Sequence, residues 1–151
     1  TVINTNKKNN AWWIFNFPFK HINEPVFVLT CDNITNINFS LITKDYIRKG
    51  KPECFLIPVK PVKELEGDFI HRKNNLVTKL SRKLKSDIYC SGIQIVNPYR
   101  INKIVKNTTD FNKVWSKLIK KKKLKVSDVL PKNWFTIDNP NQLKTYLKKN
   151  L

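Results

Sequence analysis

The spacing of hydrophobic residues changes along this chain, and this change constrains the fold more than any other feature. Early in the chain, apolar and polar residues alternate, most clearly in Ile34–Thr43, as along a strand with one wet face. Later, behind the candidate capping residue Asp110, apolar residues repeat at helical spacing. That stripe comprises Phe111, Val114, Trp115, Leu118 and Ile119. Strand patterns early and helix patterns late favour the α+β class.

The predicted sheet is small, antiparallel and built on a hairpin, with helices packed on one face. The hairpin joins Pro25–Cys31 to Ile34–Thr43, because Asp32-Asn33 suits a tight two-residue turn. Prolines interrupt Lys51–Val62, which is therefore predicted to be an edge strand at best. A further strand is expected over Asp87–Val96.

Three more helices are expected, two before and one after the stripe that begins at Phe111. Asn75 is a candidate cap for a helix over residues 75–85, whose polar face would carry Lys79, Arg82 and Lys83. A short helix is expected over Tyr99–Lys106, and Asn139-Pro140 opens a helix near the C-terminus.

The chain divides into three predicted parts. Residues 1–10 form a flexible polar arm, residues 11–125 form a single α+β domain, and residues 126–151 form a C-terminal extension that ends in a short helix. Both extensions are basic. The length of 151 residues fits one domain with a substantial core.

Positive charge is concentrated in one part of the chain. The sequence holds 29 Lys and Arg against 11 Asp and Glu, a net charge of +18. Residues 71–125 hold 16 of these basic residues and only Asp87 and Asp110 as acids, a net charge of +14. An AT-rich coding sequence raises lysine everywhere, but it does not remove acids from one segment. The segregation therefore indicates a polyanionic partner.

The predicted binding surface consists of cations that suit phosphate groups. Because lysine is a point charge, binding is expected to be salt-sensitive and only weakly sequence-specific. Tyr99 is a candidate for stacking on an unpaired base, although packing at a helix start explains it equally well. The candidate RNA-binding residues are Arg72, Lys73, Lys79, Arg82, Lys83, Arg100, Lys103, Lys113, Lys117, Lys120, Lys121, Lys122, Lys123 and Lys125.

The sequence offers no recognisable catalytic or metal site. Its three glycines form no phosphate-cradling loop, which argues against P-loop and dinucleotide-binding enzymes. His71 stands in a basic stretch, and a metal-dependent nuclease that uses it as a base is a minor alternative. Glu53, Glu64, Glu66 and Asp68 could hold Mg²⁺ as a nuclease requires, but a solvated loop is the favoured interpretation. The expectation is a protein that is not an enzyme and holds no metal or cofactor.

Cysteine spacing and hydropathy bear on the compartment. Cys31, Cys54 and Cys90 are odd in number and widely spaced, which indicates neither a disulfide framework nor a zinc site. No apolar run approaches the roughly 18 residues of a membrane span, so no membrane association is expected. We expect an intracellular protein in a reducing compartment, with the mitochondrial matrix favoured over the cytoplasm. Removal of a targeting peptide before Thr1 stays open.

Segregated charge and the lack of a catalytic signature favour a structural RNA-binding subunit of a large ribonucleoprotein. The specific prediction is a mitochondrial ribosomal protein that contacts the rRNA backbone and neighbouring proteins.

The main alternative is a protein–protein adaptor or assembly chaperone. A hairpin sheet, then the sequence LVTKLSRKL, then a strand and a helix is similar to small proteasome-assembly chaperones. In this alternative, the sheet edge and either Trp12-Trp13 or Trp134-Phe135 contact protein, and the lysine content of the α+β domain is incidental.

Overall fold

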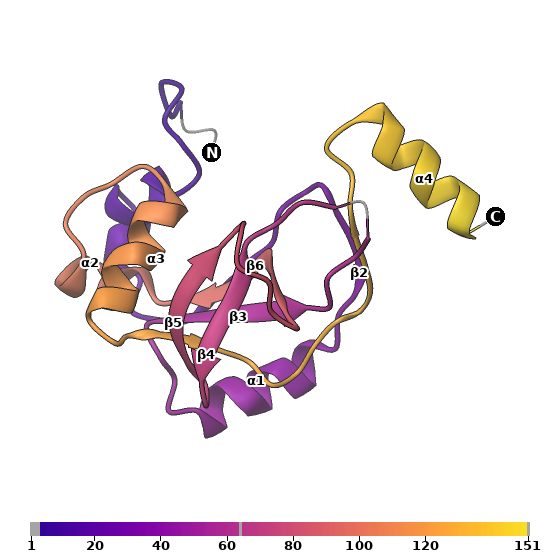
Figure 1. Cartoon of the computed structure of the whole chain (residues 1–151). Helices are drawn as coiled ribbons and strands as arrows, with labels where there is room; N and C mark the ends of the chain where they lie inside the picture. The colour runs from indigo at the N-terminus through magenta and orange to yellow at the C-terminus, as the bar shows by residue number, and fades with distance from the viewer. Residues whose placement is uncertain (1–3, 64, 151) are drawn as a thin grey trace.

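A six-stranded mixed sheet forms the centre of the computed structural model, which describes residues 4–63 and 65–150 (Figure 1). Its strand order is β1-β6-β3-β7-β5-β4, and β2 and β8 form a second, two-stranded sheet. The strands are β1 (Val26–Val28), β2 (Asn33–Asn36), β3 (Cys54–Val59), β4 (Phe69–Lys73), β5 (Leu76–Ser81), β6 (Tyr89–Val96), β7 (Leu124–Val126) and β8 (Lys132–Thr136). The predicted α+β class is confirmed. The first three residues of the predicted N-terminal arm, Glu64 and residue 151 lie outside the described residues.

Helices surround the sheet and connect its strands. The α-helices are α1 (Phe39–Arg48), α2 (Pro98–Ile104), α3 (Phe111–Lys120) and α4 (Pro140–Asn150), and two short 3-10 helices are η1 (Trp12–Phe15) and η2 (Phe19–His21). The predicted stripe is confirmed in α3, where Asp110 caps the helix by accepting a hydrogen bond of 2.8 Å from the Asn112 amide. In the described residues, no helix is both long enough and apolar enough to cross a membrane.

The core has two layers, one on each face of the sheet. Because side chains alternate along a strand, Cys54 and Leu56 of β3 join the cluster under α3, while Phe55 and Ile57 join the cluster under α1. In Figure 1, α1 accordingly lies apart from α2 and α3 across the sheet. Helices thus cover both faces, whereas the sequence pattern had predicted helices on one.

The hairpin is not where the sequence pattern placed it. β1 pairs with β6 and β2 pairs with β8, so Asp32-Asn33 does not close a hairpin. The rest of Ile34–Thr43 becomes the start of α1, because the Asn38 side chain caps that helix by accepting from the Leu41 amide at 3.0 Å. Sequence alternation alone did not reveal this cap.

The true hairpin joins β4 to β5, and the predicted helix over residues 75–85 is wrong. Asn74 has a φ of 55°, which lets the chain reverse tightly just before β5. Leu76, Val77 and Leu80 fit a helical stripe, but in the sheet β5 instead pairs with β4 and β7.

β3 is a central strand and not an edge strand. All its residues are buried, and it lies between β6 and β7. Proline is tolerated because β7 pairs only with Cys54–Leu56, so Pro58 lies beyond that ladder and beside a register shift with β6.

The C-terminal segment returns to the body of the protein. β8 pairs antiparallel with β2, with Asn33 opposite Thr136 and Ile34 opposite Phe135. The predicted helix after Asn139-Pro140 is confirmed as α4, and the ring of Phe135 lies 5.4 Å from that of Tyr146. This pairing brings together two parts of the chain that are far apart in sequence.

Candidate active site

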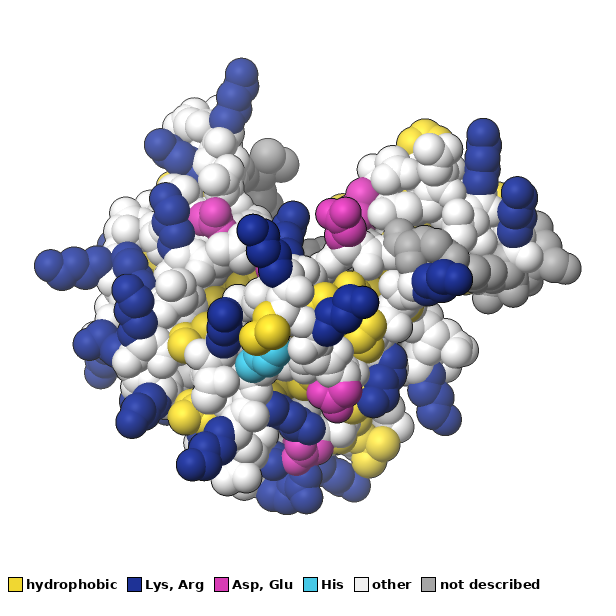
Figure 2. Space-filling model, viewed as in Figure 1, with side chains coloured by type: hydrophobic (Ala, Val, Ile, Leu, Met, Phe, Trp, Pro, Cys, Tyr) yellow, Lys and Arg dark blue, Asp and Glu magenta, His cyan; other side chains and the backbone are white. Residues whose placement is uncertain are grey.

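The predicted RNA-binding cations lie on many different elements. Figure 2 shows Lys and Arg side chains spread over the visible face, with apolar and neutral surface between them. They occupy β4 (Arg72, Lys73), β5 (Lys79), the loop after it (Arg82, Lys83), α2 (Arg100, Lys103), α3 (Lys113, Lys117, Lys120), the turn after α3 (Lys121, Lys122, Lys123) and β7 (Lys125).

Several of these cations have partners within the fold. Arg72 forms an ion pair of 2.7 Å with Asp128, and Arg100 forms one of 3.0 Å with Glu53. The Lys103 ammonium lies 4.3 Å from the centre of the Tyr99 ring, so this predicted base-stacking ring already holds an intramolecular cation. The two ion pairs tie separate parts of the fold together, whereas the Lys103–Tyr99 contact lies within α2.

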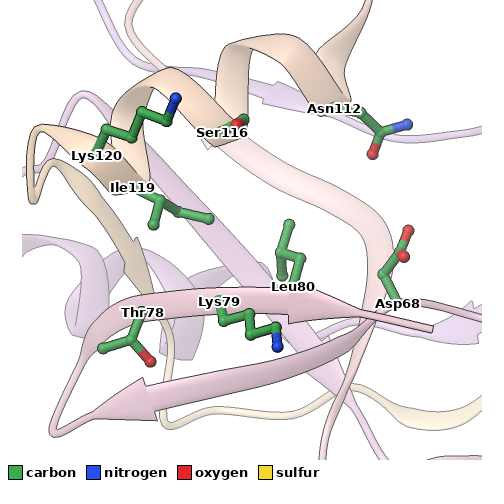
Figure 3. A pocket seen from close by; sticks show the side chains of 8 residues that line it. All are labelled: Asp68, Thr78, Lys79, Leu80, Asn112, Ser116, Ile119 and Lys120. Atoms are coloured by element: carbon green, nitrogen blue, oxygen red, sulfur yellow. The ribbon is translucent and has the colours of Figure 1, made fainter. Parts of the chain in front are cut away.

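Lys79 and Lys120 both line a cleft of about 340 Å³ between α3 and the β4–β5 hairpin. Figure 3 shows Leu80 and Ile119 directed toward one another across this cleft, with Asp68 at one end. Asp68 and Asn112 also line a second cleft, so the two clefts lie next to each other.

That second cleft concentrates acidic side chains in a chain that has few. It encloses about 240 Å³, and four of the 11 acidic residues line it: Asp32, Glu66, Asp68 and Asp138. Sequence reasoning assigned these residues to turns and loops. The available signal was that Asp32 lies a short distance beyond the carboxyl end of the apolar strand β1, the end at which ligands of α/β folds bind.

Asp32 is held in the turn between β1 and β2 by a network of side chains. The Asn33 amide group donates to Thr30 Oγ1 at 2.5 Å and to the Ser91 carbonyl at 3.0 Å. Thr136 Oγ1 donates to Asp32 Oδ2 at 3.4 Å, and the Ile137 amide donates to the Asp32 carbonyl at 3.0 Å. The turn is therefore tied to β6 through the Asn33 side chain, and the Asp32 carboxylate itself contacts β8 through Thr136.

Asp138 reaches the same cleft because β8 ends two residues earlier. Its amide donates to Gln142 Oε1 at 2.6 Å, in the first turn of α4. Asn139 caps that helix by accepting from the amides of Asn141 and Gln142, each at 3.1 Å. The start of α4 thus sets the position of the second carboxyl group.

The two carboxyl groups perturb one another. Burial, a hydrogen bond with Asp32 and repulsion by its charge raise the pKa of Asp138. Burial acts to raise the pKa of Asp32 as well, but hydrogen bonds from Thr30, its own backbone, Asp138 and Thr136 outweigh it and lower that pKa. The pKa values of two carboxyl groups that share a site move apart because ionisation of both groups is unfavourable.

The pair also leaves one oxygen unsatisfied. Within the described part of the chain, Asp32 Oδ1 is the buried side-chain oxygen or nitrogen without a hydrogen-bond partner. Leaving such an acceptor unpaired is costly, and clusters of perturbed carboxyl groups in clefts are typical of functional sites. A cation between Asp32 and Asp138 would satisfy this oxygen and relieve the repulsion.

The carboxylates of Asp32 and Asp138 suit Mg²⁺ better than a metal ion whose ligands all come from the protein. In residues 4–63 and 65–150, no three or more His, Cys, Asp or Glu side chains gather as a metal-binding group. Mg²⁺ is usually bound by one or two carboxylates and completes its shell with phosphate oxygens and water. Asp32 and Asp138 supply such a pair.

Residues of β6 also line this cleft. Gly92 has a φ of 80°, and a Cβ there would lie 3.2 Å from Thr30 Cγ2, so glycine allows β6 to approach this strand end closely. Next to it, burial raises the pKa of the Cys90 thiol to about 12. The thiol is therefore protonated at neutral pH and is a poor nucleophile.

The chain matches no known family model and no curated protein. Solved structures resemble it in fold. A protein from Bacillus anthracis assigned as a glucose-1-phosphate thymidylyltransferase, in complex with a sucrose, matches with a TM-score of 0.64 and 14% identity over 85% of this chain and 56% of its own. The inositol-1-phosphate CTP transferase of T. maritima matches with a TM-score of 0.60 and 16% identity over 83% and 54%.

A third similar structure is the nucleoside-diphosphate-sugar pyrophosphorylase of Vibrio cholerae RC9, with a TM-score of 0.57 and 12% identity over 82% of this chain and 56% of its own. The chain therefore spans little more than half the length of these proteins. At such identities the likeness shows the fold alone, which this chain shares with part of these three proteins.

This fold corrects the functional predictions. The expected mitochondrial ribosomal subunit with a structural, RNA-binding role is wrong, and so is the adaptor or proteasome-assembly-chaperone alternative, because the similar folds are those of nucleotidyltransferases. The prediction that the chain is not an enzyme is overturned by the same finding. It had rested on the lack of a catalytic motif, whereas the candidate site is assembled from turns distant in sequence.

Proposed function

We propose that this chain forms the metal-binding part of a catalytic unit that transfers a nucleotidyl group to a phosphorylated sugar or polyol. The observation that carries this proposal is the pair of carboxyl groups of Asp32 and Asp138 in one cleft, where Asp32 Oδ1 is buried and has no hydrogen-bond partner. The nucleotidyltransferase-like fold supports it. The printed names of the three neighbours supply the substrate class: a sugar phosphate, an inositol phosphate and a nucleoside-diphosphate sugar.

In such a reaction a phosphate oxygen of the acceptor attacks the α-phosphorus of a nucleoside triphosphate. A bond forms between that oxygen and the α-phosphorus, and the bond from the α-phosphorus to the bridging oxygen breaks, which releases pyrophosphate. The acceptor phosphate is already ionised near neutral pH, so the attack requires no general base. The residues described around the cleft include no histidine, in keeping with this chemistry.

The chain's own residues would hold and orient the reactants. Asp32 and Asp138 would hold Mg²⁺, which supplies charge neutralisation at the phosphate oxygens. Thr136 contacts the Asp32 carboxylate, Asn33 holds the turn that carries it, and Gly92 lets β6 approach Thr30 closely beside the cleft. Catalysis of phosphoryl-type transfers depends mainly on positioning and electrostatics, which suits a cleft without a nucleophile.

Binding of Mn²⁺, a paramagnetic substitute for Mg²⁺, tests this proposal. The free Mn²⁺ signal is followed by electron paramagnetic resonance as the 151-residue chain is titrated. We expect one equivalent of bound Mn²⁺, and Asp32→Asn and Asp138→Asn should each weaken its binding at least about tenfold. Asp87→Asn is the matched control, because Asp87 is exposed and does not line the cleft.

Two results would overturn the proposal. One is Mn²⁺ binding that is equal in the wild-type chain and in both cleft variants, which would place the ion on scattered surface carboxylates. The other is a folded chain that binds no Mn²⁺ at all. Circular dichroism of each variant verifies that a loss of binding is not a loss of fold.

A further inference from the structure

The cleft between α3 and the β4–β5 hairpin differs in charge from the cleft that holds the carboxyl pair. Lys79 and Lys120 line the first, which is named the lysine cleft below. No described residue that lines the second, the carboxyl cleft, is a lysine or an arginine. Asp68 is the one acid among the described residues that line the lysine cleft. Its charge is already offset, because Arg82 Nε lies 3.6 Å from its carboxylate and does not line this cleft.

The two lysines of this cleft have no partner within the described fold. Neither ammonium group forms an ion pair or a hydrogen bond with a described residue. Other cations of the chain are used internally, as Arg100 and Lys123 are by Glu53. The lysine cleft therefore carries positive charge that is free to meet a ligand. A lysine ammonium is a compact point charge that suits phosphate.

The rest of the lysine cleft offers an apolar contact surface and hydrogen-bond donors. Leu80 of β5 and Ile119 of α3 are half-buried and point toward one another across it (Figure 3). Asn112 and Ser116 line it from α3, four positions apart and so on one face of the helix. Neither side chain forms a hydrogen bond with a residue that the structure describes. Binding pockets commonly combine apolar walls with a few polar groups that orient the ligand.

The helix α3 lines both clefts. Asn112 and Trp115 line the carboxyl cleft, and Asn112, Ser116 and Lys120 line the lysine cleft. Trp115 Nε1 donates to Gln94 Oε1 at 2.9 Å, which anchors α3 to β6 beside the carboxyl cleft. Ser116 and the two lysines belong to the lysine cleft alone. A ligand held by them is therefore separate from the groups that react.

We propose that the lysine cleft binds a small organic phosphate that is not the acceptor of the reaction. The ammonium groups of Lys79 and Lys120 hold the phosphate, and the Ser116 hydroxyl donates to one of its oxygens. The uncharged part of the ligand packs against Leu80 and Ile119. An organic phosphate is favoured over the free ion because only the former uses this apolar surface. The inference goes beyond the proposed function and does not depend on it.

Nuclear magnetic resonance of the isotope-labelled 151-residue chain tests this assignment, since amide shifts both locate a ligand and measure its affinity. Phenyl phosphate is the organic probe, and inorganic phosphate is the ion without an apolar part. Both are titrated at constant ionic strength, which keeps the screening of surface charge equal. We expect phenyl phosphate to cause saturable shifts at residues 78–80 and 116–120. It should bind at least about threefold more tightly than inorganic phosphate, because its ring covers apolar surface.

Three lysine variants separate a built site from general attraction to a basic protein. Lys79→Gln and Lys120→Gln should each weaken phenyl phosphate binding about three- to fivefold, because each removes one contact between charges. Lys113→Gln is the matched control, since Lys113 is an exposed lysine of α3 that lines neither cleft. It removes the same charge and should leave the affinity unchanged.

Several results would overturn the assignment. They are shifts that do not saturate or that spread over the whole surface, equal weakening by Lys113→Gln, and equal affinity for the two probes. Loss of phenyl phosphate binding in a folded Asp32→Asn variant would overturn it as well, because the ligand would then lie in the carboxyl cleft. If the wild-type chain binds phenyl phosphate as expected but binds no Mn²⁺, the proposed function alone fails.

Discussion

Trp134 donates a hydrogen bond of 3.0 Å from its indole Nε1 to Oδ1 of Asn33, a residue 101 positions away in the sequence. The bond links β8 to β2 just before Asp138 and just after Asp32. It therefore fixes the register that brings the two carboxyl groups into one cleft.

Trp134→Phe should weaken both the fold and the metal site. Phenylalanine keeps an apolar ring but cannot donate to Asn33, so we expect a loss of about 1 kcal/mol in the free energy of unfolding. Mn²⁺ binding should weaken in parallel, because the position of Asp138 relative to Asp32 is less constrained. Trp12→Phe, on η1 outside the cleft, is the control. Unchanged Mn²⁺ affinity alongside the lost stability would show that the bond serves the fold alone.

The sequence predicted elements well where their partners are local. The helix at Phe111 was found because its cap and its whole apolar stripe lie within ten residues. The same local reasoning failed for residues 75–85, where the spacing of Leu76 and Leu80 fits a helix. The positive φ of Asn74 and pairing with β4 decide in favour of a strand.

The candidate site was missed for a physical reason. Asp32 and Asp138 each look like ordinary turn residues in sequence, and only the pairing of β2 with β8 makes them neighbours. Long-range strand pairing leaves no signature in local spacing. The lysines, in contrast, stand out in the sequence, but several of them have partners inside the fold, as Lys123 has in Glu53.

Asp138→Asn should stabilise the protein at neutral pH. The folded-state pKa of Asp138 is raised, so its ionisation opposes folding above that pKa and has no effect at low pH. We expect a Tm increase of about 2–4 °C at neutral pH that disappears below about pH 4. Asp32→Asn should do the opposite and lower the Tm at neutral pH, because the folded-state pKa of Asp32 is lowered. Thermal melts of both variants across this pH range measure these changes in Tm. A Tm change of the same sign for Asp32→Asn and Asp138→Asn at neutral pH would contradict the opposite pKa shifts of the two carboxyl groups.

Asp45→Asn should destabilise the protein in a pH-dependent way. The buried Asp45 carboxylate accepts from Ser127 Oγ at 2.7 Å, from the Asp128 amide at 2.9 Å and from Arg48 at 2.6 Å. Burial acts to raise its pKa, but these bonds outweigh that effect and lower it. Their stabilisation is present above the ordinary pKa of aspartate and is lost as the pH falls through the lowered one. For Asp45→Asn, urea unfolding should show a loss of about 2 kcal/mol in the free energy of unfolding at neutral pH, and this loss should shrink below about pH 4. The control Asp87→Asn should change the free energy of unfolding little.

Gly92→Ala should test how closely β6 must approach the end of β1. Gly50 and Gly92 both have positive φ, at 83° and 80°, so alanine at either position costs roughly 1–2 kcal/mol in backbone strain. Only at position 92 does the new Cβ also meet a neighbour, Thr30 Cγ2 at 3.2 Å; at position 50 nothing lies within 4 Å. Gly92→Ala should therefore lose more stability than Gly50→Ala in urea unfolding, and it should also weaken Mn²⁺ binding. Adding Thr30→Ser removes Cγ2 but keeps the hydroxyl that accepts from Asn33, so it should recover part of both losses. If the double variant recovers neither, the clash with Thr30 is not the cause.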